Sequence, residues 1–131
     1  MIDTATTRTG KDRVRHETMT PRQIHSLMRR LCYFGVAAAD GYRHLARAGG
    51  LDRELVQQLI DDYVVTDDVI VYADAFHCAH VPKSAAFGLI LEYRSIDARS
   101  RIRVVADDFS AHIVVEPIDV GVGEQRRKPS P

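Results

Sequence analysis

The stretch from Asp68 to Pro117 constrains the fold of this chain most strongly. Its apolar residues follow a period of two, the spacing of side chains on one face of a β-strand. Four segments show this alternation, at residues 68–76, 85–94, 100–106 and 111–116. Their short connections favour antiparallel neighbours, since parallel strands need a crossover of a dozen or more residues. The stretch therefore predicts a four-stranded antiparallel meander.

Charged residues within the meander give a second prediction, of its register. In the register that the turns favour, Arg101 lies opposite Glu116 and Glu92 lies opposite Arg103. Opposite charges that face each other across a strand pair stabilise a sheet by a few tenths of a kcal/mol up to about 1 kcal/mol. Both pairs fall on the same face, and this agreement supports the antiparallel arrangement.

Before the strands, the sequence predicts two helices. Thr20-Pro21-Arg22-Gln23 forms a capping box with proline at the first helical position, and apolar residues then recur every three or four residues as far as Leu45. Gly49-Gly50 ends this first helix, and Asp52 caps a second one over residues 53–63. The expected fold is α+β, with an N-terminal helical hairpin packed on a four-stranded antiparallel meander.

The polar ends of the chain differ from this body. Residues 1–18 and 124–131 have no apolar period, so we expect a disordered N-terminal extension, a single domain over 19–123 and a disordered basic C-terminal tail. No apolar run reaches the roughly 18 residues that cross a bilayer, and the N-terminus lacks the apolar centre of a signal peptide. Two cysteines cannot make a disulfide framework, which favours a cytoplasmic protein.

The net charge shows that the chain is not strongly basic. The chain has 18 basic and 18 acidic residues, whereas nucleic-acid binders usually gain affinity from an excess of bases. The first predicted helix does carry a set of basic residues that could bind nucleic acid, although the neutral net charge of the chain does not favour this function. This set is Arg22, Arg29, Arg30, Arg43 and Arg47.

A set of apolar residues falls on the outer face of the predicted sheet, away from the helical hairpin. Its members are Ile90, Val105, Val114, Ile70 and Tyr72. Exposed apolar patches of this kind usually mark a contact with another protein. We therefore expect a protein partner or a homodimer at this face, and a small accessory or regulatory protein that works by protein–protein binding rather than as an enzyme.

Two chemical alternatives remain open, and the first lies in one loop. Asp74, His77, Cys78 and His80 are residue types that bind zinc, although their spacing matches no standard zinc motif. A histidine beside Cys78 could instead activate the thiol for a metal- or thiol-dependent enzyme. Neighbours in an extended chain point to opposite sides, so either use needs a sharp loop. We expect the protein to bind no cofactor, and zinc binding by this loop is the one alternative that stays open.

The second alternative is an RNA-cleaving site on the sheet. Arg101, Arg103, His112 and Glu92 could bind phosphate and exchange protons. The order of elements, two helices and then an antiparallel sheet, resembles ribonuclease toxins of the RelE and MqsR types. That resemblance implies a sheet-borne site. No residue motif of those families is present, and Glu116 and Glu92 would neutralise two of the arginines.

Overall fold

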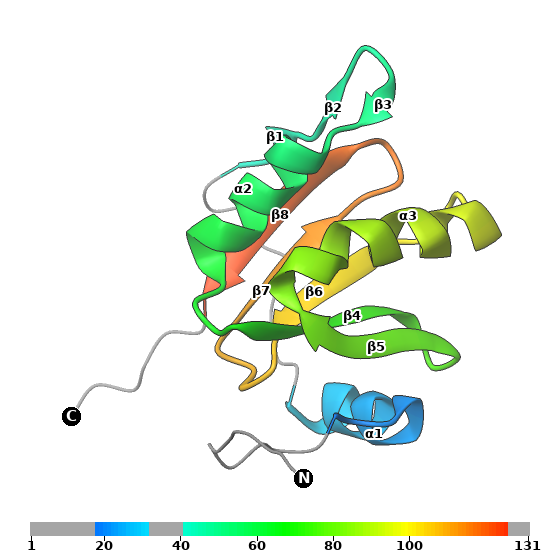
Figure 1. Cartoon of the computed structure of the whole chain (residues 1–131), viewed down its shortest axis with the longest axis vertical. Helices are drawn as coiled ribbons and strands as arrows, with labels where there is room; N and C mark the ends of the chain where they lie inside the picture. Colours follow the sequence, from blue (N-terminus) through cyan, green and yellow to red (C-terminus); the bar gives the residue numbers. More distant parts are fainter. Residues whose placement is uncertain (1–17, 32–40, 126–131) are drawn as a thin grey trace, which may run out of the picture.

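A computed structural model describes residues 18–31 and 41–125, which form a six-stranded main sheet with helices on both of its faces and a separate two-stranded hairpin (Figure 1). The helices are α1 (Pro21–Leu31), α2 (Arg53–Tyr63) and α3 (Ala86–Ile96), and a 3₁₀ turn, η1 (Lys83–Ala85), precedes α3. The main sheet contains β1 (Arg43–His44), β4 (Asp68–Asp74), β5 (His77–Pro82), β6 (Ile102–Ala106), β7 (Ala111–Val115) and β8 (Val120–Gln125). Two further strands, β2 (Ala46–Arg47) and β3 (Gly50–Leu51), form a separate small hairpin.

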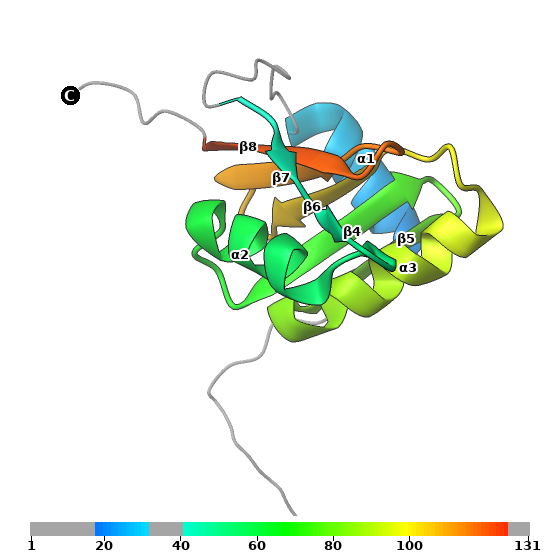
Figure 2. The ribbon, with the colours of Figure 1, turned by 90° about the horizontal axis from the view of Figure 1, so that it is seen from above.

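All neighbours in the main sheet are antiparallel, in the order β1-β8-β7-β6-β4-β5. Figure 2 shows α2 and α3 on one side of the sheet and α1 on the other. The larger core lies beneath α2 and α3, where side chains of β4, β6 and β7 meet both helices. Its fully buried members include Leu59, Ile60, Val71, Ile90, Val104 and Ile113.

A smaller core lies between α1 and the opposite face of the sheet. Ile24 and Met28, one helical turn apart, pack there against Ile70, Val105 and their neighbours. Both faces of the sheet are therefore covered, which gives three layers where the sequence predicted two.

The predicted starts of α1 and α2 are confirmed. Thr20 Oγ1 accepts the Gln23 N–H at 3.2 Å and Gln23 Oε1 accepts the Thr20 N–H at 2.9 Å, which is a complete capping box. Asp52 Oδ2 accepts the Leu55 N–H at 3.1 Å. Short polar side chains at these positions satisfy amides that a helix cannot bond internally, so the signal is local and readable from sequence.

The predicted helical hairpin is wrong. Helix α1 is described as far as Leu31, the next nine positions lie outside the described residues, and residues 41–51 hold β1 and the β2–β3 hairpin. Gly50, with φ of +110°, is the first residue of β3, directly after the turn of that hairpin, and does not cap a helix. The apolar stripe predicted over this part fails as well, because Leu45 is buried while Tyr42 stays half exposed.

The predicted strand over residues 85–94 is also wrong, because this segment is helix α3. Its residues are apolar almost all round, so they satisfy a period of two and a helical period alike. The buried set Ala86, Phe87, Ile90 and Tyr93 follows the helical spacing. A fully apolar segment fits a helix that lies in the core, and the extent of α3, eleven residues, is long for a strand.

The strands β4, β6 and β7 confirm three of the four predicted segments, whereas β5 and β8 were predicted as loop and closing segment. The predicted β6–β7 register is correct: Val104 lies opposite Ile113, and Arg101 Nε is 3.0 Å from Glu116 Oε1. The other predicted charge pair does not form, because Arg103 lies opposite Tyr72. Strand β8 continues through Gln125, beyond the predicted end of the domain.

Candidate functional site

The predicted outer apolar face is not an exposed surface. Ile70, Tyr72, Val105 and Val114 do share one face of the sheet, as the register requires. However, Ile70, Val105 and Val114 are fully buried, and Tyr72 is partly buried. Ile90 belongs to the other layer, on α3. The correction follows from the third layer, since α1 packs on the face that the sequence left open.

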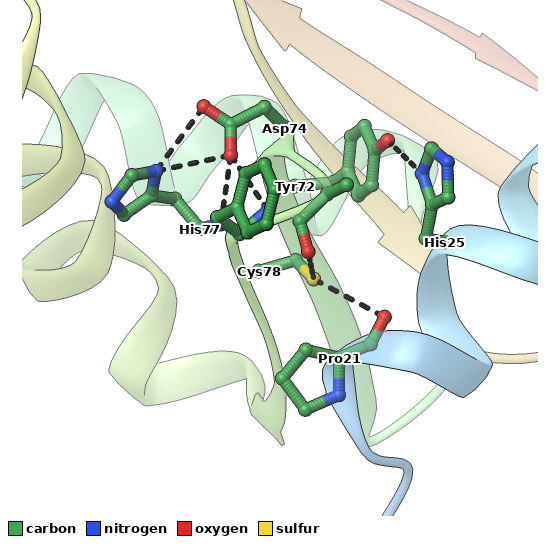
Figure 3. A network of polar contacts seen from close by, with 8 residues as sticks. Pro21, His25, Tyr72, Asp74, His77 and Cys78 are labelled. Atoms are coloured by element: carbon green, nitrogen blue, oxygen red, sulfur yellow. Dashed lines mark hydrogen bonds and ion pairs between the residues drawn. The ribbon is translucent and has the colours of Figure 1, made fainter.

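His77 and Cys78 lie on opposite faces of β5. Figure 3 shows the Cys78 side chain directed toward Pro21 of α1, where its Sγ lies 3.8 Å from the Pro21 carbonyl oxygen. His77 points to the side of α3, and its ring lies 6.0 Å from that of Tyr93. Burial raises the pKa of the Cys78 thiol, and the charge of Asp74 acts in the same direction. The histidine therefore does not activate the cysteine.

Asp74 and His77 form a local pair at the β4–β5 turn. Asp74 Oδ1 accepts the N–H groups of Phe76 and His77 at 2.8 and 2.9 Å, and it lies 3.0 Å from His77 Nδ1. These bonds lower the pKa of the Asp74 carboxyl although burial opposes them. The pair fixes the turn, and of the four predicted zinc ligands the structure brings only these two together.

The fourth predicted ligand, His80, joins a different cluster with Asp107 and Asp68, whose polar atoms lie within 4.8 Å of one another. His80 Nδ1 accepts the Met19 N–H at 3.1 Å, so the ring proton sits on Nε2 and is directed to Asp107 Oδ2, also at 3.1 Å. Both ring nitrogens are thus engaged. A metal ion would have to break one of these bonds, and the cluster instead fixes the start of α1 on the sheet.

The predicted nuclease residues are only partly assembled. Arg101, Arg103 and His112 share the α1 face of the sheet, but Glu92 lies on α3 in the other layer. His112 is 1% exposed, and its burial, with the charge of Arg103, lowers its pKa to about 4. A buried, neutral imidazole at 3.4 Å from Glu124 suits a structural role better than proton exchange with a substrate.

A contact that the sequence did not predict joins α1 to β4. His25 Nδ1 lies 2.7 Å from the Tyr72 hydroxyl, and the two rings are stacked, with centroids 6.1 Å apart and planes 7° apart (Figure 3). Burial raises the pKa of Tyr72, although the charges of Arg103 and Arg29 partly oppose it. No spacing rule links residues 47 positions apart, so only the strand–helix packing reveals this group.

Large exposed apolar side chains lie along one end of the sheet, from the β4–β5 turn at one edge to β1 at the other, and we call this the apolar end. Phe76 in the β4–β5 turn is 86% exposed, Ile118 in the β7–β8 turn 78%, Ile96 at the end of α3 56%, and Tyr42 before β1 50%. The strand pairing places both turns at this end, together with the end of α3 (Figure 1). Among the described residues, only Val65 and Leu91 are comparable side chains outside the group.

The apolar end contains a hollow. It is lined by Tyr42, Arg101, Glu116, Pro117, Ile118 and Val120. Arg94 in the last turn of α3 fixes the adjoining turn: its Nη2 donates to the Pro117 carbonyl at 3.1 Å and lies 2.6 Å from Asp119 Oδ1. The exposed Ile118 therefore sits on a turn that Arg94 braces.

Comparisons with known proteins give no assignment: no family model, no curated protein and no solved structure matches this chain. Within the described ranges, no helix is both long enough and apolar enough to span a membrane.

Proposed function

We propose that this protein acts by protein–protein binding, as a small accessory or regulatory protein of the cytoplasm, and that its contact surface is the apolar end. The observation that carries the proposal is the exposure of Tyr42, Phe76, Ile96 and Ile118 along one end of the sheet. Single exposed apolar residues are ordinary, but a group of them on one surface is typical of an interaction site. The buried free thiol of Cys78 is in keeping with a reducing compartment.

The energetics favour burial of this end by a partner. Covering a large apolar side chain contributes about 1.5–3 kcal/mol relative to leaving it in water. Phe76 and Ile118 are almost fully exposed, so they have the most to gain. The brace between Arg94 and the β7–β8 turn reduces the conformational entropy that binding would otherwise cost.

The partner that this surface fits is a second copy of the chain. Phe76 projects from one turn, and the hollow beside Tyr42 and Ile118 lies at the same end of the sheet. A two-fold axis would let Phe76 of each copy enter the hollow of the other, which is the self-complementary arrangement of most homodimers. Arg101 and Glu116, already paired at the rim, add no net charge to oppose the approach.

Sedimentation velocity over a range of protein concentrations tests the proposal. We expect a concentration-dependent dimer that Phe76→Ser and Ile118→Ser each weaken by at least tenfold. Both side chains are exposed, so neither change should disturb folding. Val65→Ser is the matched control, because Val65 is 77% exposed but lies before β4, at the opposite end of the sheet.

Two results would count against this proposal. The first is a monomer at every concentration up to about 0.5 mM, since a dimer weaker than this corresponds to less than about 5 kcal/mol of association free energy. The second is a dimer that Val65→Ser weakens as much as Phe76→Ser does, because the contact would then lie elsewhere.

A further inference from the structure

The exposed side of α1 is a cationic surface. Residues 18–31 contain no acidic residue. Arg22, His25, Ser26, Arg29 and Arg30 line one shallow hollow along the helix. The three arginines are exposed, and no carboxylate of the described residues lies within ion-pair distance of them.

The stacked pair of His25 and Tyr72 extends this cationic surface from α1 to the sheet. The 2.7 Å contact and the parallel rings form a flat aromatic group at the junction of α1 and β4, which we call the His25–Tyr72 plate. Tyr72 lies opposite Arg103 on β6, and a second hollow is lined by Tyr72, Ala73, Arg101 and Arg103. The plate thus lies between the arginines of α1 and those of β6.

Two acidic groups beside the Tyr72 end of this surface are already engaged. Asp74 accepts two amides of its own turn and faces His77, and Glu116 lies 3.0 Å from Arg101. Arg101 is therefore partly neutralised, and the exposed Arg22, Arg29 and Arg30 of α1 are the main source of positive potential. Guanidinium groups bind phosphate oxygens through paired N–H donors.

We propose that this surface binds single-stranded nucleic acid, with the arginines on backbone phosphates and the His25–Tyr72 plate under a base. Arg22 and Arg29 lie about 10 Å apart along the helix, at about 1.5 Å per residue, so they would contact different phosphates of one strand. A single phosphorylated side chain would instead require guanidinium groups that converge on one point. Aromatic rings between cationic side chains are typical of single-strand binding.

This inference does not depend on the proposed function, since it uses the α1 face and not the apolar end. Because the chain as a whole is neutral, binding rests on a few local contacts and is sensitive to salt. With about four phosphates contacted, affinity should fall about 50-fold between 50 and 200 mM salt, from a slope of about 0.7 per phosphate.

Fluorescence anisotropy of a labelled twelve-nucleotide oligouridylate tests the inference. The double variant R29Q/R30Q should lose at least tenfold in affinity at 50 mM salt and lower the salt slope by about 1.4, whereas R103Q should lower it by about 0.7. Arg53→Gln, which like R103Q removes one positive charge but from α2 on the opposite face of the sheet, should change affinity by less than twofold. Tyr72→Phe should keep the stacking, and Tyr72→Leu should lose about tenfold.

Three outcomes would overturn the inference. One is no binding at 50 mM salt with 100 μM protein. Another is a loss of binding free energy per charge removed that is equal in R29Q/R30Q and in Arg53→Gln, which would indicate non-specific attraction. The third is tight binding of a phosphoserine peptide or of tripolyphosphate with none of the oligonucleotide, which would assign the arginines to an isolated phosphate group. Phe76→Ser should bind like the unaltered protein, which separates this test from that of the apolar end.

Discussion

Gly123 on β8 lies directly against the ring of Tyr63, the last residue of α2. A Cβ atom on Gly123 would stand 2.5 Å from Cγ and from Cε2 of that ring, which is closer than carbon atoms can approach. Two residues earlier on the same face, a Cβ on Gly121 would stand 2.6 Å from Leu45 Cδ1. The glycines of β8 therefore allow α2 to lie close to the sheet.

This contact predicts that Gly123→Ala destabilises the protein. Overpacking of a tight core costs about 1–3 kcal/mol, so the free energy of unfolding in urea should fall by that amount. Gly88→Ala in α3 is the matched control: a Cβ there meets nothing within 4 Å, and the helix should gain about 1 kcal/mol. A Gly123→Ala protein as stable as the parent would show that α2 moves freely on β8.

The Asp52 cap gives a second prediction. Asp52→Ala removes the acceptor for the Leu55 N–H and should lower the free energy of unfolding by about 1 kcal/mol. Asp61→Ala removes an exposed carboxylate near the other end of α2, where negative charge is unfavourable, together with a long 3.9 Å ion pair to Lys83, so the change should be close to neutral. Equal losses in the two variants would mean that the cap contributes nothing specific.

The stability of the protein should depend on pH through His112. Its pKa of about 4 in the fold lies below the ordinary value of 6.5, so between these values the unfolded chain binds a proton that the folded chain does not. The free energy of unfolding should therefore fall as the pH drops from 6.5, by about 2 kcal/mol at pH 5. Above pH 6.5 this contribution is constant.

Urea denaturation at pH 7.5 and pH 5 measures this effect. In the His112→Gln variant, the difference in the free energy of unfolding between the two pH values should become small, whatever the overall stability of the variant. Burial also raises the pKa of the Glu124 carboxyl, which makes the folded chain bind a proton more readily than the unfolded chain. That effect has the opposite sign and grows as the pH rises through the carboxyl range. A variant that keeps the full slope would assign the pH dependence to other groups.

The thiol of Cys78 should react slowly in the folded protein. It is 6% exposed, and burial raises its pKa, so little thiolate is present and access is poor. In a Cys32→Ser background, a thiol-specific disulfide reagent should react with Cys78 at least about 100-fold more slowly before denaturation than after it. A fast native reaction would return the thiol-dependent enzyme to consideration.

Sequence patterns succeeded where the physical cause is local. The Thr20–Gln23 and Asp52 caps depend on side chains that bond amides three residues away, and both were predictable. The β6–β7 register follows from two segments joined by a short turn, and the Arg101–Glu116 pair confirms it. The clearest local failure was α3, whose apolar residues satisfy both periods and whose helical state depends on burial against the sheet and against α2.

The sequence by itself therefore determined an α+β domain, two helix starts and three strands, because these depend on contacts within a few residues. Only the tertiary structure decided that α1 covers the second face of the sheet, where Ile24 and Met28 bury Ile70 and Val105 and His25 pairs with Tyr72. It also separated His77 from Cys78, since the pleat of β5 directs neighbours to opposite layers. Such long-range packing is set by the combined burial of several elements, which no single segment encodes.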